Sequence, residues 1–269
     1  MQKYLLLTMI ILAAAVTARS QEKADANAKK RQPVNVGGAD DKAGGTVTGV
    51  VRFKGAKPEP KPLTDIAGNS FCKSCYKEGE LPLRDNVVFG KNGSDDTLQN
   101  VLVYVSKGLE GKKFDPPEES VVLDQVGCVY TPHVVAVMAG QTLEIRNSDA
   151  TLHNVMSAPR NNPPFNFGMP VKDQEVEKVF KAPELKVNLK CFMHPWMSSY
   201  VHVLEHPFFA VTGPDGTFTI KGLPPGDYEL TVLHETSLFD PTPAVATVKI
   251  GGGDTKTVDF TYQPKNSAK

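Results

Sequence analysis

The 269-residue chain has no excess of charge of either sign, because 30 lysines and arginines balance 30 aspartates and glutamates. Nucleic acids and anionic membranes are bound mainly through basic surfaces, which such a composition does not supply. The charge balance therefore predicts no nucleic-acid partner and no attraction to an anionic membrane.

Amphipathic helices are also missing, since no stretch repeats apolar residues with the 3.6-residue period of a helix. Short alternating or β-branched runs take their place, separated by Gly, Pro, Asn and Asp. Examples are GTVTGVVRF (45–53), VLVYVSK (101–107) and QTLEIRN (141–147). Many short strands with turns between them are typical of an all-β sandwich or barrel, and we expect an all-β fold.

Histidine and cysteine are scarce, with six and four residues, and FCKSC (71–75) is the one C-x-x-C motif. A zinc knuckle needs a second such pair, and a thioredoxin-type site needs a βαβ setting that this sequence does not show. Copper oxidases and reductases need a further histidine-rich site. The sequence therefore predicts that the protein is not an enzyme.

The N-terminal residues 1–20 have a lysine at position 3, continue with an apolar run over 4–16 and then reach small residues. This order is typical of a secretory signal peptide. A membrane anchor is the alternative, but the run is shorter than the roughly 20 residues of a spanning helix. We expect a periplasmic or extracellular protein that has no membrane span once the signal is removed.

The remaining organisation is discontinuous. Residues 21–44 are polar and predict a disordered linker, and 264–269 form a tail. The stretch VTGPDGTFTIKGLPPGDYELTVLHE (211–235) resembles the transthyretin-like (carboxypeptidase regulatory-like) β-sandwich. Only five strands are evident after residue 207, which is a thin core for a sandwich. We therefore expect one module from 45–118 plus 207–263, with 119–206 inserted; two sequential sandwiches are the alternative.

The inserted stretch carries residues that bind soft metals. His153 follows the expected strand at 141–147, and Cys191, His194 and Met197 lie together in the heptapeptide CFMHPWM. One thiolate and two imidazoles with a weak axial thioether are the ligand set of a type 1 copper site. Sulfur favours Cu(I) and imidazole suits Cu(II), so this combination predicts one-electron chemistry.

Residues 119–206 resemble the cupredoxin (blue copper) family, of the amicyanin or plastocyanin type. The resemblance rests on the short C-x-x-H-x-x-M loop with a proline after its histidine, on LHNV (152–155), and on the run VVLDQVGCVYTPHVVAVMAGQTLEIRN (121–147). It implies a cupredoxin-type Greek-key β-sandwich beside a second, transthyretin-like or Ig-like β-sandwich.

The resemblance also implies site residues. His153, Cys191 and His194 would be the equatorial ligands of one copper ion, and Met197 the axial ligand. Asn154 would brace the ligand loops and hydrogen-bond near the sulfur, where such contacts tune potential and orientation.

The same resemblance implies a docking surface. His194 would present its outer edge to solvent, and Pro195 and Trp196 would form an apolar patch around it. Protein electron donors and acceptors would dock there transiently.

Other candidate ligands are expected to take no part. Met193 lies between the thiol and the imidazole, where an extended segment points its side chain away from the site. The remaining histidines have no evident ligand partners, and these are His133, His202, His206 and His234.

The cysteine pairing stays open at this point. Exported proteins usually pair their cysteines, so Cys72–Cys75 and Cys128–Cys191 disulfides without a metal are one hypothesis. If Cys191 binds copper, Cys128 pairs with Cys72 or Cys75, or Cys72 pairs with Cys75 and Cys128 stays reduced.

The sequence thus predicts an exported type 1 copper protein that carries single electrons between redox partners. The alternative is a non-redox cupredoxin-like protein that handles copper, or that binds polysaccharide or a surface partner through its β-sandwich modules.

Overall fold

The computed structural model describes residues 44–78 and 80–265. The expected signal peptide, residues 21–43 of the expected linker and the last four residues of the tail lie outside the described residues. Strands dominate these ranges, which contain two short helical segments, η1 (Thr64–Gly68) and α2 (Ser70–Ser74). This confirms the predicted all-β class. None of the helices in the described part of the chain has the length and apolar character needed to cross a membrane.

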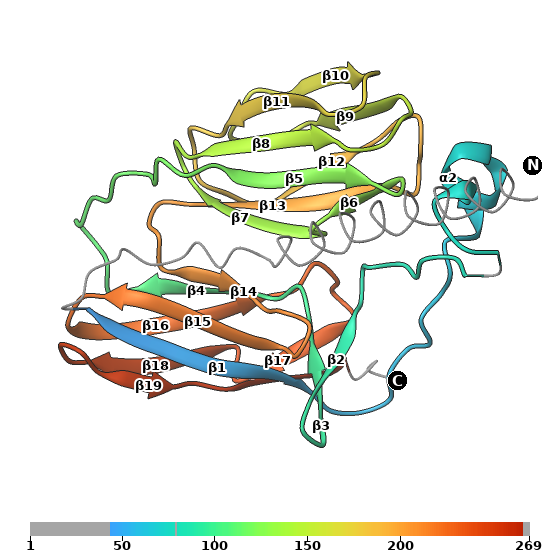
Figure 1. Ribbon diagram of the computed structural model, residues 1–269. Helices are drawn as coiled ribbons and strands as arrows, with labels where there is room; N and C mark the ends of the chain where they lie inside the picture. The colour runs from blue at the N-terminus through green and yellow to red at the C-terminus, as the bar shows by residue number, and fades with distance from the viewer. Residues whose placement is uncertain (1–43, 79, 266–269) are drawn as a thin grey trace, which may run out of the picture. The chain divides into compact units, whose positions relative to one another are not determined.

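One pair of sheets combines strands from both ends of the described chain (Figure 1). A seven-stranded sheet has the order β17-β20-β1-β3-β2, with β15 and β19 also paired to β1, and a four-stranded sheet has the order β14-β4-β16-β18. Their bounds are β1 (Gly45–Phe53), β2 (Phe89–Asn92), β3 (Asp95–Leu98), β4 (Leu102–Lys107), β14 (Phe209–Val211), β15 (Thr217–Leu223), β16 (Gly226–Leu233), β17 (Phe239–Thr242), β18 (Val245–Ile250), β19 (Thr255–Thr257) and β20 (Phe260–Pro264).

The pairings of β1 and β4 join segments that are far apart in sequence. Strand β1 runs antiparallel to β15 and parallel to β19 and β20, and β4 lies between β14 and β16. The described residues after 207 form seven strands where the sequence suggested five, because β17 and β19 are only four and three residues long. One buried cluster includes Val47 and Phe260 of the seven-stranded sheet and Leu230 of the four-stranded sheet, so the two sheets form a sandwich.

A second pair of sheets is built from residues 121–204. A five-stranded sheet has the order β10-β9-β12-β13-β7, and a four-stranded sheet has the order β11-β8-β5-β6. Their bounds are β5 (Val121–Val126), β6 (Val129–Thr131), β7 (Val134–Met138), β8 (Thr142–Asn147), β9 (His153–Ser157), β10 (Phe165–Met169), β11 (Gln174–Val179), β12 (Glu184–Lys190) and β13 (Ser198–Leu204). Leu123, Leu143 and Val155 lie in the core that both sheets share.

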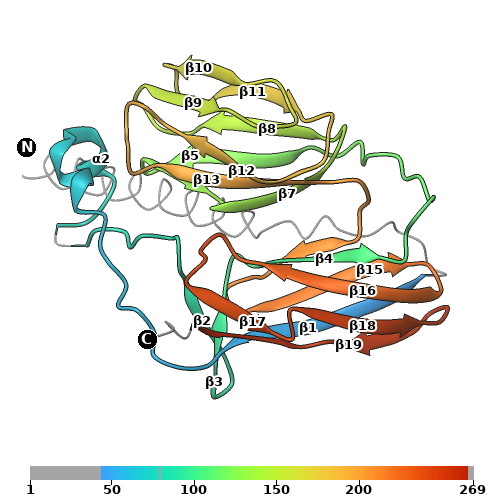
Figure 2. The same cartoon turned by 180° about the vertical axis from the view of Figure 1, so that it is seen from behind.

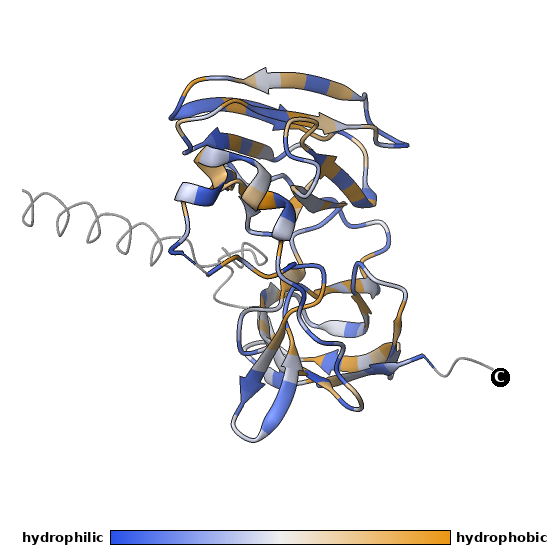
Figure 3. Ribbon diagram, turned by 90° about the vertical axis from the view of Figure 1, so that its right-hand side faces the viewer, coloured by the Kyte–Doolittle hydropathy of each residue, from blue (hydrophilic) through white to orange (hydrophobic). Residues whose placement is uncertain are grey.

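Alternation along the strands explains which face each one buries. In β8, every second residue of TLEIRN is buried, as expected for a strand with one face on a core. Orange and blue bands accordingly alternate along the strands in Figure 3. Strand β7, which Figure 2 shows from behind, is buried along its whole length. Its Val135 and Val137 enter the second core, and its other three residues join a third cluster with Phe209 of β14.

The segment between β1 and β2 is not a strand where it meets the second pair of sheets. Residues 63–76, here called the cap segment, contain η1 and α2. Leu63, Ile66 and Cys72 of this segment are buried in the second core. The Asn69 side chain accepts a hydrogen bond from the Cys72 backbone N–H and so caps the N-terminus of α2.

Candidate metal centre

Two neighbouring strands bring the predicted ligands together. His153 is the first residue of β9, and Cys191 directly follows β12. These strands pair through Lys190 and Met156, so the end of β12 lies beside β9. The loop 191–197 then returns to β13 and is closed by backbone hydrogen bonds, from the Met197 N–H to the carbonyl of His194 and from the Cys191 N–H to the carbonyl of Met197.

Three donor atoms converge between these elements. The Nδ1 atoms of His153 and His194 are 3.0 Å apart, and the Cys191 Sγ is 3.7 Å from Nδ1 of His194. The three ligand atoms all lie within 4.8 Å of one another, and the three side chains are buried. Met197 is buried in the same core, whereas Met193 is 53% exposed. The four predicted ligands therefore share one region of the fold, and Met193 points away from it.

Asn154 lies where the sequence placed it. Its backbone N–H donates to Sγ of Cys191 at 3.4 Å, and its side-chain oxygen accepts from the Phe192 N–H at 3.2 Å. Its side-chain nitrogen donates to the carbonyl of Phe167 at 3.1 Å. Asn154 thus ties the ligand loop to β10 and gives the sulfur a hydrogen-bond donor.

Asp149 is a part of the site that the sequence reasoning missed. Its Oδ2 accepts from Nε2 of His153 at 2.9 Å and from the Cys128 backbone N–H at 2.8 Å, while its Oδ1 accepts from the Gly127 N–H at 2.8 Å. Because Nε2 of His153 donates its hydrogen bond to Asp149, Nδ1 of the same ring faces Cys191 and His194. A carboxylate four residues before an expected ligand in NSDATLH was the available signal.

The electrostatics of the site favour a thiolate. Burial by itself raises the pKa of Cys191, but the interactions with His153 and His194 and the N–H of Asn154 lower it to about 6. Burial lowers the pKa of His153, whereas Asp149 and the Cys191 sulfur raise it, with a net increase. At neutral pH, the sulfur is therefore ready to bind a cation.

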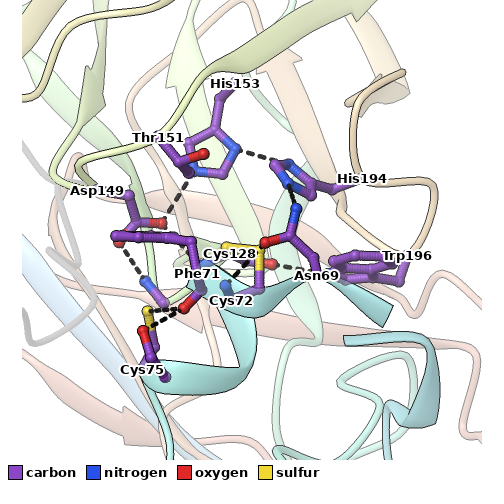
Figure 4. The surroundings of a disulfide bond; sticks show 12 residues. Asn69, Phe71, Cys72, Cys75, Cys128, Asp149, Thr151, His153, His194 and Trp196 are labelled. Carbon is purple, nitrogen blue, oxygen red and sulfur yellow. Dashed lines mark hydrogen bonds and ion pairs between the residues drawn. A yellow bond between two sulfur atoms is a disulfide. The ribbon is translucent and has the colours of Figure 1, made fainter. Parts of the chain in front are cut away.

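The cysteine pairing is resolved by a bond between Cys72 of α2 and Cys128, with an S–S distance of 2.07 Å (Figure 4). Cys75 and Cys191 are free thiols, the former exposed and the latter buried. The hypothesis of Cys72–Cys75 and Cys128–Cys191 disulfides is therefore wrong. Cys128 lies in the two-residue turn between β5 and β6, where Gly127 and Cys128 both have positive φ, as the tight hairpin turn requires.

The expected exposure of His194 is wrong. Its side chain is only 2% exposed, because the cap segment covers it. Figure 4 shows the amide of Asn69 pointing toward the His194 ring, and its Nδ2 lies 3.3 Å from Nε2 of His194. Trp196, expected at the surface, is half-buried against the second core and donates its indole N–H to the carbonyl of Cys128 at 2.9 Å.

The exposed apolar residues of the loop 191–197 differ from those predicted to surround His194. Phe192 is 63% exposed, and Met193 and Pro195 are also exposed. Of the predicted docking residues, Pro195 alone is exposed. The surface that the loop offers thus differs from the one expected around His194.

The other histidines lie outside the ligand cluster. His133 is buried between Asp85, at 3.0 Å, and Glu235. Burial lowers the pKa of His133, but these two carboxylates raise it to about 10. Burial lowers the pKa of His202 to about 3 and, with the charge of His133, that of His234 to about 4. His206 contacts the carbonyl of Val105.

Comparisons with known proteins place copper proteins among the structural neighbours. No protein-family model and no curated protein matches the chain. A copper-containing nitrite reductase from Thermus scotoductus SA-01 is 23% identical over 36% of this chain and 24% of the reductase, with a TM-score of 0.30. A purple cupredoxin from Nitrosopumilus maritimus is 23% identical over 31% of this chain and 98% of its own, with a TM-score of 0.26.

A mutant of amicyanin in its Cu(I) form is 19% identical over 38% of this chain and 97% of its own, with a TM-score of 0.29. This chain therefore spans about a quarter of the reductase and nearly the full length of the two smaller proteins. These neighbours are thus a copper-containing reductase, a purple cupredoxin and a Cu(I) form of amicyanin.

Proposed function

We propose that the protein is an exported type 1 copper protein that carries single electrons and performs no substrate chemistry. The observation that carries the proposal is the buried convergence of one cysteine sulfur and one ring nitrogen from each of two histidines within 4.8 Å of one another. His153, Cys191 and His194 would hold the copper, with Met197 as the axial ligand.

The donor set fits the metal. A thiolate with two imidazoles and a thioether accommodates both Cu(I) and Cu(II), whereas Mg²⁺ and Ca²⁺ prefer oxygen ligands. The lowered pKa of Cys191 supplies the thiolate at neutral pH. Bound copper would supply a one-electron redox couple.

The residues of the chain hold this donor set in place. Asp149 orients His153 through Nε2, and Asn154 donates to the Cys191 sulfur. Both contacts come from elements packed on the second core, so the donors have little freedom to move. A rigid arrangement suits electron transfer, because a site that changes little between oxidation states loses little energy to rearrangement.

Transient redox partners would dock on the exposed part of the ligand loop, at Phe192, Met193 and Pro195. Phe192 follows Cys191 directly, so a partner on this surface would lie close to the sulfur. Asn154 holds the backbone of Phe192 through a hydrogen bond, which fixes this part of the loop.

The test is the addition of Cu(II) to the purified apo protein. An intense visible absorption from thiolate-to-copper charge transfer is expected, and Cys191→Ser should abolish it. Cys75→Ser is the matched control, since it removes the exposed thiol outside the cluster and should leave the absorption unchanged. A colourless protein, or colour that persists in Cys191→Ser, would overturn the proposal.

The burial of His194 favours one other function, the holding of copper without electron exchange. A ligand edge covered by Asn69 offers no short route to a partner at that face. Stopped-flow mixing of the Cu(I)-loaded protein with a small one-electron oxidant separates the two. Rapid oxidation supports the electron carrier, and a reaction that is slow while copper stays bound supports copper handling.

A further inference from the structure

Three cysteines meet where the cap segment touches the β5–β6 turn. Cys72 of α2 is bonded to Cys128, and Cys75 is a free, exposed thiol three residues further along the same helical turn (Figure 4). Cys75 keeps right-handed helical backbone angles, with φ −71° and ψ −13°. A free thiol thus stands beside a disulfide and in C-x-x-C spacing with one of its two sulfurs.

The disulfide itself is closed to solvent. Cys72 and Cys128 are both 0% exposed, so a thiol in solution cannot approach their sulfurs without local opening. Cys75 is exposed and lies against the turn that carries Cys128, since a Cβ placed on Gly127 would be 4.0 Å from the Cys75 Cβ. Cys75 is therefore a solvent-accessible thiol that lies next to the buried disulfide.

The spacing allows Cys75 to reach Cys72. Residues three apart on a helix are neighbours, with Cβ atoms roughly 5–6 Å apart. The Cα separation of such a pair falls in the range that disulfides span. A disulfide needs Cβ atoms roughly 3.5–4.5 Å apart, so the short turn that carries Cys72 and Cys75 must also tighten before their sulfurs can bond.

We propose that Cys72, Cys75 and Cys128 form a thiol–disulfide exchange site whose co-substrate is a dithiol. The thiolate of Cys75 attacks Sγ of Cys72, so that the Cys72–Cys75 bond forms and the Cys72–Cys128 bond breaks. Cys128 leaves as a thiolate and takes up the proton that Cys75 lost, with no net oxidation. The external dithiol then reduces the Cys72–Cys75 bond to two thiols and becomes a disulfide itself.

Exchange changes the surroundings of the candidate metal centre. It cuts the covalent link between the cap segment and the β5–β6 turn, and it frees a thiol at Cys128. One ligand atom each of Cys72, Cys128 and His194 lie within 4.8 Å of one another. The exchange site therefore borders His194, and its state decides whether the cover over this residue is covalently held.

The experiment uses the full-length apo protein, so its outcome does not depend on copper. The protein is treated with dithiothreitol, quenched in acid at intervals and alkylated, and each cysteine is assigned by mass spectrometry. A transient species with Cys72 linked to Cys75 and Cys128 alkylated is expected first. Full reduction follows.

Cys75→Ser removes the internal nucleophile and should slow the loss of the Cys72–Cys128 bond by about tenfold or more, because the reductant must then reach a buried sulfur. Ser74→Ala is the matched control. Ser74 and Cys75 both donate to the carbonyl of Phe71, so the control loosens the same turn without touching a thiol. Its reduction rate should equal that of the natural protein.

Burial and the charge of Asp149 raise the pKa of Cys75, so the exchange should accelerate with pH beyond the usual range of a thiol. Equal rates for Cys75→Ser and the natural protein would overturn the proposal. So would direct loss of the Cys72–Cys128 bond with no Cys72–Cys75 species, or a bond that resists excess dithiol altogether.

Discussion

The Nδ2 atom of Asn69 lies 3.3 Å from Nε2 of His194. Oδ1 of the same amide accepts from the Cys72 N–H, so it is the NH₂ group that faces the imidazole. Nε2 of His194 is therefore the acceptor, and a neutral ring carries its proton on Nδ1, the atom that faces the other two donors. If Nδ1 of His194 bound a metal, the ring proton would have to move to Nε2. There the N–H of the imidazole would face the NH₂ group of Asn69, so that two hydrogen-bond donors would meet with no acceptor between them.

Asn69→Asp should therefore strengthen metal binding. A carboxylate accepts the Nε2–H of a metal-bound His194, and aspartate caps a helix as well as asparagine does. We expect an affinity for Cu(II) about tenfold higher than that of the natural protein, measured by competition with a chelator. Asn69→Ala removes the contact without replacing it, so its affinity for Cu(II) should lie between those of the natural protein and of Asn69→Asp. Weaker binding by the aspartate variant would contradict the assigned roles of Asn69 and His194.

Asp149→Asn should weaken metal binding. The change replaces an acceptor that serves His153 and the β5–β6 turn together. Loss of such an orienting partner costs about 10–100-fold in affinity, and the same chelator competition measures it. Thr151→Ala in the same loop is the control and should bind as the natural protein does. An unchanged affinity in Asp149→Asn would show that the carboxylate does not orient the ligand.

The disulfide should stabilise the fold by constraining the unfolded chain. Its cysteines are 56 residues apart in sequence, and the chain-entropy relation for a loop of this length gives a contribution of about 4 kcal/mol. Urea denaturation of the apo Cys72→Ala/Cys128→Ala variant should show a loss of that size in the free energy of unfolding. Cys75→Ser, at an exposed position, should change it by less than about 0.5 kcal/mol. Equal stability of the double variant would contradict this account.

His133 should make stability depend on pH. Its pKa is raised from 6.5 to about 10 in the fold by Asp85 and Glu235, with Lys186 and His234 as the positive or titratable neighbours. Below pH 6.5, both the folded and the unfolded chain hold the proton, and the contribution is complete. Between pH 6.5 and about 10, the unfolded chain loses the proton first, so the contribution declines.

The difference in unfolding free energy between the natural protein and His133→Gln should therefore shrink as the pH rises from 6.5 to 10. Chemical denaturation at several pH values measures it. A difference that stays constant over this range would show that the imidazolium is not what Asp85 and Glu235 stabilise.

The convergence of the candidate ligands was predictable because its information is local. Cys191, His194 and Met197 lie within one loop, and the alternating pattern of TLEIRN shows that a strand with one buried face precedes His153. The spacing of a short loop limits which side chains can converge. The all-β class followed from the same kind of local pattern.

The cover over His194 was not predictable in this way. Asn69 lies 125 residues from His194 in sequence, and its position depends on which cysteine forms the disulfide with Cys128. Composition and periodicity do not determine this disulfide pairing, since Cys72 and Cys75 lie at similar sequence distances from Cys128. Without it, the loop of a small cupredoxin-like sandwich was expected to leave its histidine open to solvent.

Strand β7 serves two cores at once, with Val135 and Val137 on one side and Val134, Ala136 and Met138 on the other. A fragment cut to residues 119–206 would bring three adjoining apolar side chains into water, and it would also lose Cys72 and the cap segment. Such a fragment should self-associate along β7. Isolating the domain with the candidate metal centre would therefore first require polar residues on that outer face and a replacement for the missing cap segment.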